Sequence, residues 1–182
     1  MKVTTFLTEG FETVEALAVV DILRRAGITV DLVSVSGEKA VKSAQGVVVN
    51  AEYTFDGHDI DDTDVIFLPG GPGHKLYEKN DKLIAQIRDF NNKNKFIAAI
   101  CAAPSILGRM GILEGKNATC FPGFEGELKG AKLADVKQRV VTDGNIITSR
   151  GMGTSVDLGL ELVKLLAGEE KAEELAVSTQ YR

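Results

Sequence analysis

The sequence predicts an α/β protein with a flavodoxin-like, open and mostly parallel sheet between layers of helices. Short β-rich runs alternate with longer segments of helical periodicity, the pattern of parallel strands joined by helical crossovers. Residues 64–68 are apolar almost throughout, as expected of a strand covered by helices on both faces. The 182 residues show no repeat, linker or change of composition, so we expect one domain over residues 1–182.

The individual elements are expected from periodicity and from turn residues. Strands are expected at residues 2–7, 28–35, 64–68, 95–100 and 118–121, with a small antiparallel excursion over 41–50. Helices are expected at residues 13–26, 81–94, 102–110, 154–167 and about 169–177. The Asp143-Gly144 pair predicts the turn of a hairpin over residues 139–148. Thr154 and Asp157 have the spacing of a helical capping box.

Composition excludes several classes of partner. The formal net charge is −5 and basic residues form no run, so neither nucleic acid nor an acidic membrane surface is an expected partner. No apolar stretch reaches the length of a membrane span, and Glu9 and Gly10 interrupt the first apolar segment too early for a signal peptide. Two cysteines make no disulfide framework. We therefore expect a cytoplasmic protein.

Cys101 carries the strongest local signal of chemistry. It lies between an expected strand and an expected helix, and the small residues Ala99 and Ala103 stand two positions before and after it, as a sharp nucleophile elbow requires. Pro104 suits the first turn of a helix. The helix N-terminus is expected to lower the pKa of the thiol, which favours the nucleophilic thiolate. The alternative is a structural cysteine, inert in the core.

The carboxyl ends of the strands bring other candidates to the same edge of the sheet. Glu15, in the first turn of the first helix, would have a raised pKa beside a thiolate and would donate or shuttle a proton, or it would only complement the helix dipole. The backbone N–H groups of Gly70, Gly71 and Ala102 would hold an oxyanion, although two glycines also serve a plain strand-to-helix turn.

The remaining titratable candidates are few. His58 lies in a polar loop and is expected at the surface, whereas His74 follows the glycine loop and is a candidate for the cleft. No histidine follows residue 74, so a Cys–His pair with a downstream histidine is excluded. Cys120 is either a core residue or a resolving thiol. Neither Cys-x-x-Cys nor His-x-x-x-His occurs, so no metal site and no cofactor are expected.

Five segments together resemble the ThiJ/PfpI family, in the branch that includes Parkinson disease protein 7. They are residues 12–15 (ETVE), Asp21 with 24–27 (RRAG), 68–71 (LPGG), 98–104 (AAICAAP), and 148–151 (TSRG) with 153–155 (GTS). The resemblance implies a flavodoxin-like fold and a homodimer. It implies that Cys101 is a reactive, redox-sensitive nucleophile, that Glu15 hydrogen-bonds its thiol, and that Gly71 and Ala102 are oxyanion positions. Arg24, Arg25 and Arg150 match family positions near the cleft and the dimer contact.

The sequence also departs from the family pattern. Human-type members carry a histidine directly before a proline downstream of the cysteine, whereas Phe121 precedes Pro122 here, which excludes a histidine base. Protease-type members place a histidine directly after the cysteine, where this chain has Ala102, so peptidase activity is disfavoured.

Three functions are compatible with the sequence. The first is a glutathione-independent glyoxalase or deglycase that acts on 2-oxoaldehydes such as methylglyoxal, or on early glycation adducts, in protection against stress. The second is a redox sensor or chaperone whose Cys101 is oxidised to sulfinic acid without turnover. The third is a binding or structural module with an inert cysteine.

Overall fold

A seven-stranded sheet forms the centre of the computed structural model, which describes residues 1–182. Its strand order is β10-β11-β7-β6-β1-β2-β5, and every neighbouring pair is parallel except the hairpin of β10 and β11. The strands of this sheet are β1 (Lys2–Leu7), β2 (Thr29–Ser34), β5 (Tyr53–Thr54), β6 (Val65–Leu68), β7 (Phe96–Ile100), β10 (Val140–Asp143) and β11 (Ile146–Ser149). The mostly parallel α/β fold predicted from the sequence is confirmed.

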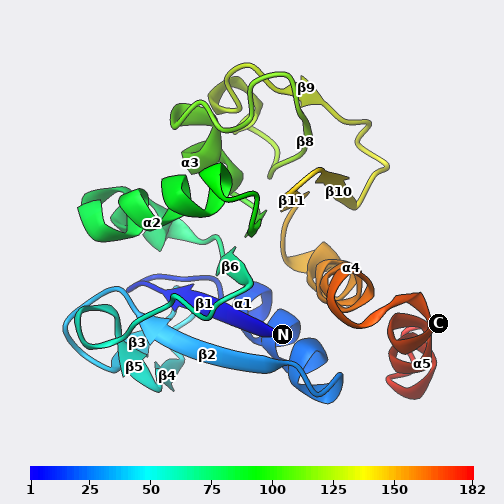
Figure 1. The fold of residues 1–182 in the computed structure, drawn as a ribbon, viewed down its shortest axis with the longest axis horizontal. Coiled ribbons are helices and arrows are strands. Elements are labelled where there is room, and N and C mark those ends of the chain that lie inside the picture. The colour runs from blue at the N-terminus through cyan, green and yellow to red at the C-terminus, as the bar shows by residue number, and fades with distance from the viewer.

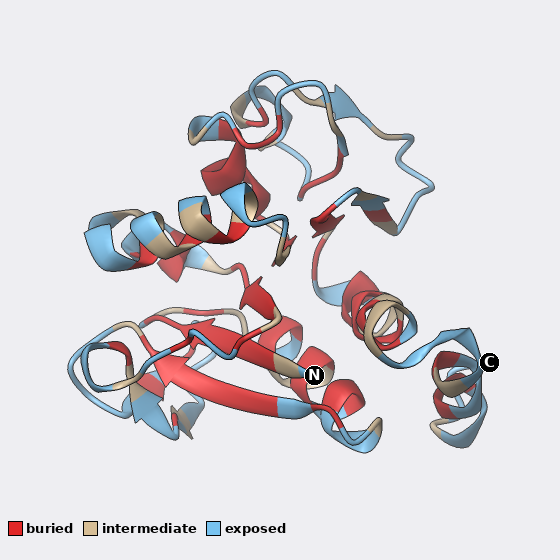
Figure 2. Ribbon diagram, viewed as in Figure 1, coloured by how far each residue is buried: buried red, intermediate tan, exposed pale blue.

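Helices cover both faces of the sheet, as Figure 1 shows with α2 and α3 on one side of β6 and α4 and α5 away from them. The α-helices are α1 (Thr13–Arg25), α2 (Asp81–Asn92), α3 (Pro104–Arg109), α4 (Ser155–Ala167) and α5 (Glu169–Ser178). Apolar residues of α1, α4 and α5 form one core cluster, and those of α2 and α3 form the other. The strands between them are buried along most of their length (Figure 2). No helix of the structure is both long enough and apolar enough to cross a membrane.

Shorter elements complete the chain. Two small sheets pair β3 (Ala40–Lys42) with β4 (Val48–Asn50), as the expected antiparallel excursion, and β8 (Asn117–Ala118) with β9 (Lys132–Leu133). The 3₁₀ helices are η1 (Phe55–Gly57), η2 (Pro72–Lys79), η3 (Glu125–Glu127) and η4 (Met152–Thr154). The Asp143-Gly144 hairpin is confirmed, and its second strand pairs in parallel with β7, which places Ser149 opposite Ile100.

The strand order creates the crevice in which the candidate residues meet. The chain passes from β1 to β2 on one side and later enters β6 on the other side of β1. Loops that leave such neighbouring strands in opposite directions leave a crevice at the carboxyl edge, the usual ligand site of open α/β sheets. The loops after β1 and β6 border this crevice, and the turn after β7 is its neighbour.

Three expectations about local structure are wrong. The strand expected over residues 118–121 ends at Ala118, because the next backbone N–H groups bond elsewhere: that of Thr119 to Thr148 Oγ1 at 3.0 Å and that of Phe121 to the Cys101 carbonyl at 2.8 Å. The loop expected over residues 69–73 ends early, because the 3₁₀ helix η2 begins at Pro72. The third concerns the capping box of α4.

That capping box does not form. Thr154 lies at the N-cap of α4, but its side chain makes no capping bond there. Its hydroxyl donates to the Gly151 carbonyl at 2.8 Å and accepts from the Gly151 N–H at 3.1 Å. The Asp157 carboxylate accepts from Arg139 and Tyr181. The preceding turn therefore takes the Thr154 side chain, and distant residues take that of Asp157.

Candidate active site

Cys101 occupies a strained turn between β7 and α3. Its φ angle is +65°, in the left-handed region that residues other than glycine seldom adopt. Neighbouring segments hold this backbone from both sides: the Cys101 N–H donates to the Ser149 carbonyl at 3.0 Å, and the Cys101 carbonyl accepts from the Phe121 N–H at 2.8 Å. Strain of this kind persists only where the surroundings enforce it, and it concentrates at functional sites.

Glu15 lies against the Cys101 thiol and is only 1% exposed. The Glu12 carboxylate caps α1 by accepting from the Glu15 N–H at 2.7 Å, which fixes the first turn of the helix. The Glu15 Oε2 atom accepts from the Gly70 N–H at 2.9 Å, and the N–H of Met152 also favours the charged form of the carboxylate. Complementing the helix dipole is therefore not the only role of Glu15, because three segments distant in sequence converge on its carboxylate.

Two positions of the loop after β6 require glycine. A Cβ atom at Gly70 would lie 2.6 Å from both Cys101 Cβ and Glu15 Oε2. Gly71 has a φ angle of +94°, and a Cβ there would lie 2.5 Å from the Glu12 N atom. The loop is fixed on the segment after β1, because the Glu12 N–H donates to the Gly70 carbonyl at 3.0 Å. The glycines let the loop approach the thiol and the carboxyl group closely.

Of the three amides predicted to hold an oxyanion, the prediction is wrong for Gly70, because its N–H donates to Glu15 Oε2, whereas those of Gly71 and Ala102 point at the sulfur. The backbone N–H groups of Gly71 and Ala102 both face Cys101 Sγ and act to lower the pKa of the thiol. An oxygen atom that forms on a carbon bonded to this sulfur would therefore develop next to two N–H donors, which is the geometric requirement of an oxyanion hole.

The Glu15 and Cys101 pair shares its protons. Burial raises the pKa of Glu15 to about 7, aided by the Glu12 charge and opposed by hydrogen bonds from the Cys101 thiol and two amides. Burial, followed by the charge of Glu15, raises the pKa of Cys101 to about 12, against the Gly71 and Ala102 amides. The lowered thiol pKa expected from the helix N-terminus is wrong, since burial and a neighbouring carboxylate outweigh a six-residue helix. Above pH 7 the pair carries one negative charge and one proton.

The structure places the other candidates around this pair to different degrees. His74 is buried beneath the glycine loop, where its Nδ1–H donates to the Gly71 carbonyl at 2.9 Å. Arg150 follows β11 and directs its guanidinium to the Val136 carbonyl at 2.8 Å. Arg25 is not brought to the thiol within this chain: it pairs with Asp21 at 2.7 Å, about 15 Å along α1 from Glu15 at 1.5 Å per residue.

His58 and Cys120 also need a comment. His58 was expected at the surface, but only 12% of its side chain is exposed, because it donates to Asp31 at 2.9 Å and stacks on Tyr53. Cys120 is a buried member of the core cluster that includes α3, whereas Cys101 packs against the cluster of α1. The interpretation of Cys120 as a core residue therefore fits its position.

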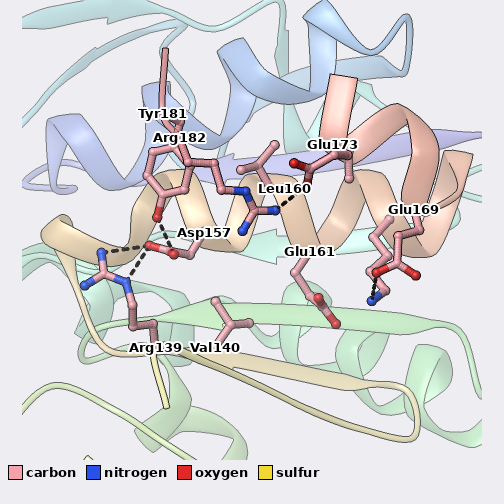
Figure 3. Close-up of a pocket in the computed structure, with 11 residues that line it drawn as sticks. Arg139, Val140, Asp157, Leu160, Glu161, Glu169, Glu173, Tyr181 and Arg182 are labelled. Carbon is pink, nitrogen blue, oxygen red and sulfur yellow. Dashed lines mark hydrogen bonds and ion pairs between the residues drawn. The ribbon is translucent and has the colours of Figure 1, made fainter. Parts of the chain in front are cut away.

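Another pocket lies away from these residues, between α4, α5 and β10 (Figure 3), with a volume of about 350 Å³. Its charged groups are mostly paired: Arg139 and Tyr181 converge on Asp157, and Arg182 bonds Glu173 at 2.7 Å. None of the predicted site residues lines it.

Sequence reasoning missed three contributors to the site. Glu12 both caps α1 and raises the pKa of Glu15. Glutamate is not a preferred N-cap residue, so nothing in the sequence indicated this capping role. The Met152 amide reaches Glu15 only through the turn after β11. The sequence indicated Phe121 only as a departure from a family histidine. Its position beside Cys101 and Glu15 is seen only in the folded chain.

Comparison with known proteins agrees with this geometry. A model described as the DJ-1/PfpI family matches residues 1–165. The DJ-1beta protein of Drosophila melanogaster is 36% identical over 93% of this chain and 91% of its own length. DJ-1 homolog B of Arabidopsis thaliana is 38% identical over 96% of this chain, and this chain spans only 40% of that longer relative. A deglycase of Thermococcus kodakarensis is 31% identical over 91% of this chain and 99% of its own length.

A solved structure extends the agreement to three dimensions. A cysteine-to-alanine mutant of a DJ-1 superfamily protein from Salmonella typhimurium superposes with a TM-score of 0.93 at 31% identity, over 100% of this chain and 98% of that one. Sequence and structure therefore agree along nearly the whole length, and the chain belongs to the DJ-1/PfpI family.

Proposed function

We propose that the chain is a cysteine-dependent enzyme that converts 2-oxoaldehydes such as methylglyoxal, or their early glycation adducts, to 2-hydroxy acids without glutathione. The observation that carries the proposal is the buried pair of Cys101 and Glu15, with a Glu15 pKa of about 7, beside two amides directed at the sulfur. A carboxyl group with this pKa both accepts and donates protons at neutral pH. The deglycase relative from Thermococcus supports the same chemistry.

The first step forms a covalent adduct. The Cys101 proton passes to Glu15, and the thiolate attacks the aldehyde carbon C1, so that an S–C1 bond forms and the C=O electron pair moves to the oxygen. The amides of Gly71 and Ala102 hold this developing oxyanion. Glu15 returns the proton to the oxygen, which gives a hemithioacetal and restores the carboxylate.

The second step moves hydrogen within the substrate. Glu15 removes the proton from C1, the C1–H electron pair forms the C1=C2 double bond, the C2 carbonyl electron pair moves to its oxygen, and Glu15 returns the proton to that oxygen to give an enediol. Protonation at C2 and loss of the C1 hydroxyl proton give a thioester of a 2-hydroxy acid. C1 is oxidised as C2 is reduced, so no external oxidant is needed. Water then cleaves the C1–S bond, which releases the hydroxy acid and the thiol.

The test is turnover of methylglyoxal without glutathione, read as loss of the aldehyde and formation of lactate. Cys101→Ser is expected to lower kcat/KM at least about 1,000-fold, because it removes the nucleophile. Cys120→Ser is the matched control and should retain activity. Equal turnover by wild type and Cys101→Ser would refute the proposal, as would no turnover by wild type.

A second function is favoured by the same donors. A sulfinate on Cys101 would accept hydrogen bonds from the Gly71 and Ala102 amides and from protonated Glu15, which would favour a redox-sensing or chaperone role without turnover. After mild peroxide, mass spectrometry should then find two added oxygen atoms at Cys101 in preference to Cys120. Equal modification of the two thiols would count against it.

We also propose that the chain acts as a cytoplasmic homodimer. Val14 of α1 is 43% exposed, and Val47 and Val48 of the adjacent β3–β4 hairpin are 46% and 58% exposed. The hairpin joins α1 through Thr13 Oγ1, which bonds Ser43 at 2.7 Å, so these side chains belong to neighbouring segments. Light scattering should give twice the chain mass of 19.5 kDa, and a monomer mass would refute the dimer.

A further inference from the structure

Phe121 is a large apolar side chain left half-exposed beside the reactive pair. The segment after β8 runs along the cysteine turn, where the Phe121 N–H donates to the Cys101 carbonyl at 2.8 Å. The Phe121 residue is 47% exposed, although the sheet next to it is buried. An aromatic ring of this size normally finds cover in the core, so its exposure at the cleft asks for an explanation.

Gly151 fixes where the Phe121 ring lies relative to Glu15. A Cβ atom at Gly151 would lie 3.2 Å from Phe121 Cδ2 and 3.7 Å from Glu15 Oε1. The ring edge and the carboxyl group therefore lie within 4 Å of the same point, which Gly151 leaves empty. A substrate atom bonded to Cys101 and handled by Glu15 would have its substituents close to this ring.

Phe121 and the turn of residues 150–152 form one rim of the site, and the rest of this rim has few groups that would bind a charged substituent. Met152, the residue after Gly151, is 56% exposed, and its N–H is directed at Glu15. The basic side chain of the same turn, Arg150, donates to the Val136 carbonyl at 2.8 Å. The polar donors of the site, the amides of Gly71 and Ala102, face the sulfur itself. The rim is thus apolar where the sulfur environment is polar.

We propose that Phe121 is a specificity-determining residue, and that the site prefers 2-oxoaldehydes with an uncharged alkyl or aryl group on C2 over glyoxal, which has only hydrogen there. The inference rests on the proposed function, because it assigns the substituent of the same substrate. The aldehyde carbon C1 lies beside the amides of Gly71 and Ala102. The C2 substituent packs on the Phe121 ring and is thereby removed from water.

The first experiment compares kcat/KM for glyoxal, methylglyoxal and 2-oxohexanal. Phe121→Ala should lower the value for 2-oxohexanal about 10-fold and that for glyoxal less than 2-fold, since loss of apolar contact in a partly open pocket has an effect of this size. Phe121→Leu should restore most of the loss. Val177→Ala, which truncates a 53% exposed apolar side chain on α5, is the matched control and should change no ratio. Equal losses for all three aldehydes would show a merely structural role and overturn the proposal.

A second experiment separates this inference from the proposed function. Cys101 is alkylated with iodoacetamide and with its N-butyl analogue, and mass spectrometry of the Cys101 peptide gives each rate separately from Cys120. Wild type should favour the butyl reagent, and Phe121→Ala should lose that preference. If wild type turned over no aldehyde but showed this result, the proposed function would fail and the apolar wall would stand. An unchanged alkylation ratio would overturn the role of Phe121 even in an active enzyme.

Discussion

Two buried carboxylates, one near the amino ends and one near the carboxyl ends of the parallel strands, have opposite kinds of partner. At the amino edge, Asp31 accepts from Lys2 at 2.8 Å and from His58 at 2.9 Å, so a lysine ammonium and an imidazole lie against it. The hydrogen bond with Asp31 raises the pKa of Lys2, as expected of a group that gains a partner. At the carboxyl edge, Glu15 is buried more deeply, and its partners are a thiol and backbone amides. The hydrogen bonds of these partners only partly offset the desolvation of its charge, so burial raises the pKa of Glu15 to about 7.

The difference indicates which edge performs chemistry. A carboxylate paired with cations keeps its charge and fixes the chain, whereas one without a cation exchanges protons near neutral pH. Backbone geometry follows the same division. The site contains a cysteine at positive φ and a glycine pressed against two side chains, whereas Gly57, in η1 away from the site, has ordinary space around it. Three substitutions test this contrast.

The largest effect is expected from Gly70→Ala. Its new Cβ would lie 2.6 Å from Cys101 Cβ and 2.9 Å from the Ile100 carbonyl oxygen, so that the loop or the cysteine turn must move. We expect a loss of more than about 3 kcal/mol in the free energy of unfolding, together with loss of turnover. Gly57→Ala is the control, because its Cβ would meet only Thr54 Oγ1, at 3.6 Å. Chemical denaturation measures both, and similar effects at the two glycines would refute the contrast.

The next effect is the pH dependence caused by Glu15. Because its pKa in the folded chain, about 7, exceeds the usual 4.5, its contribution to stability is present below pH 4.5 and is lost as the pH rises through 7. The loss amounts to about 3 kcal/mol by pH 8. Glu15→Gln removes the charge, so its stability should fall less between pH 5 and pH 8, while turnover drops.

Urea unfolding at pH 5 and pH 8 measures this difference, with the exposed Glu170→Gln as control. Parallel pH profiles for wild type and Glu15→Gln would contradict it. The same variant should titrate Cys101 at a lower pH than wild type, because the Glu15 charge raises the pKa of that thiol. Thiolate absorbance, corrected with Cys101→Ser, reports this pKa.

The smallest effect is expected at the amino edge. Asp31→Asn keeps the shape of the side chain but removes the charge that faces Lys2 and His58, and we expect a loss of about 2 kcal/mol without a change in methylglyoxal turnover. Asp62→Asn, which changes the exposed partner of the same lysine, should destabilise the fold less. A loss of turnover in Asp31→Asn would contradict the contrast between an amino edge that stabilises the fold and a carboxyl edge that performs the chemistry.

The sequence predicts the sheet and the helices well because their signals are local. Alternating periodicities and the Asp143-Gly144 turn lead to the correct layers. The predictions fail where tertiary partners compete, as at Asp157, whose carboxylate accepts from Arg139 and Tyr181. Glu15 shows how far the sequence can predict the site. A glutamate in the first helical turn is equally compatible with the helix dipole, and only the adjacency of β1, β6 and β7 in the sheet brings it to Cys101. The predicted lowering of the Cys101 pKa is wrong for the same reason, because a sequence motif does not show how deeply the thiol is buried.

The positive φ of Cys101 has a consequence for how such a protein evolves. A left-handed backbone at a non-glycine residue and a buried carboxylate without a cation both make the native state less stable than it would otherwise be. Drift toward greater stability therefore favours glycine at position 101 and an amide at position 15, and either change removes a reacting group. A lineage that retains both residues shows that selection on their chemistry continues.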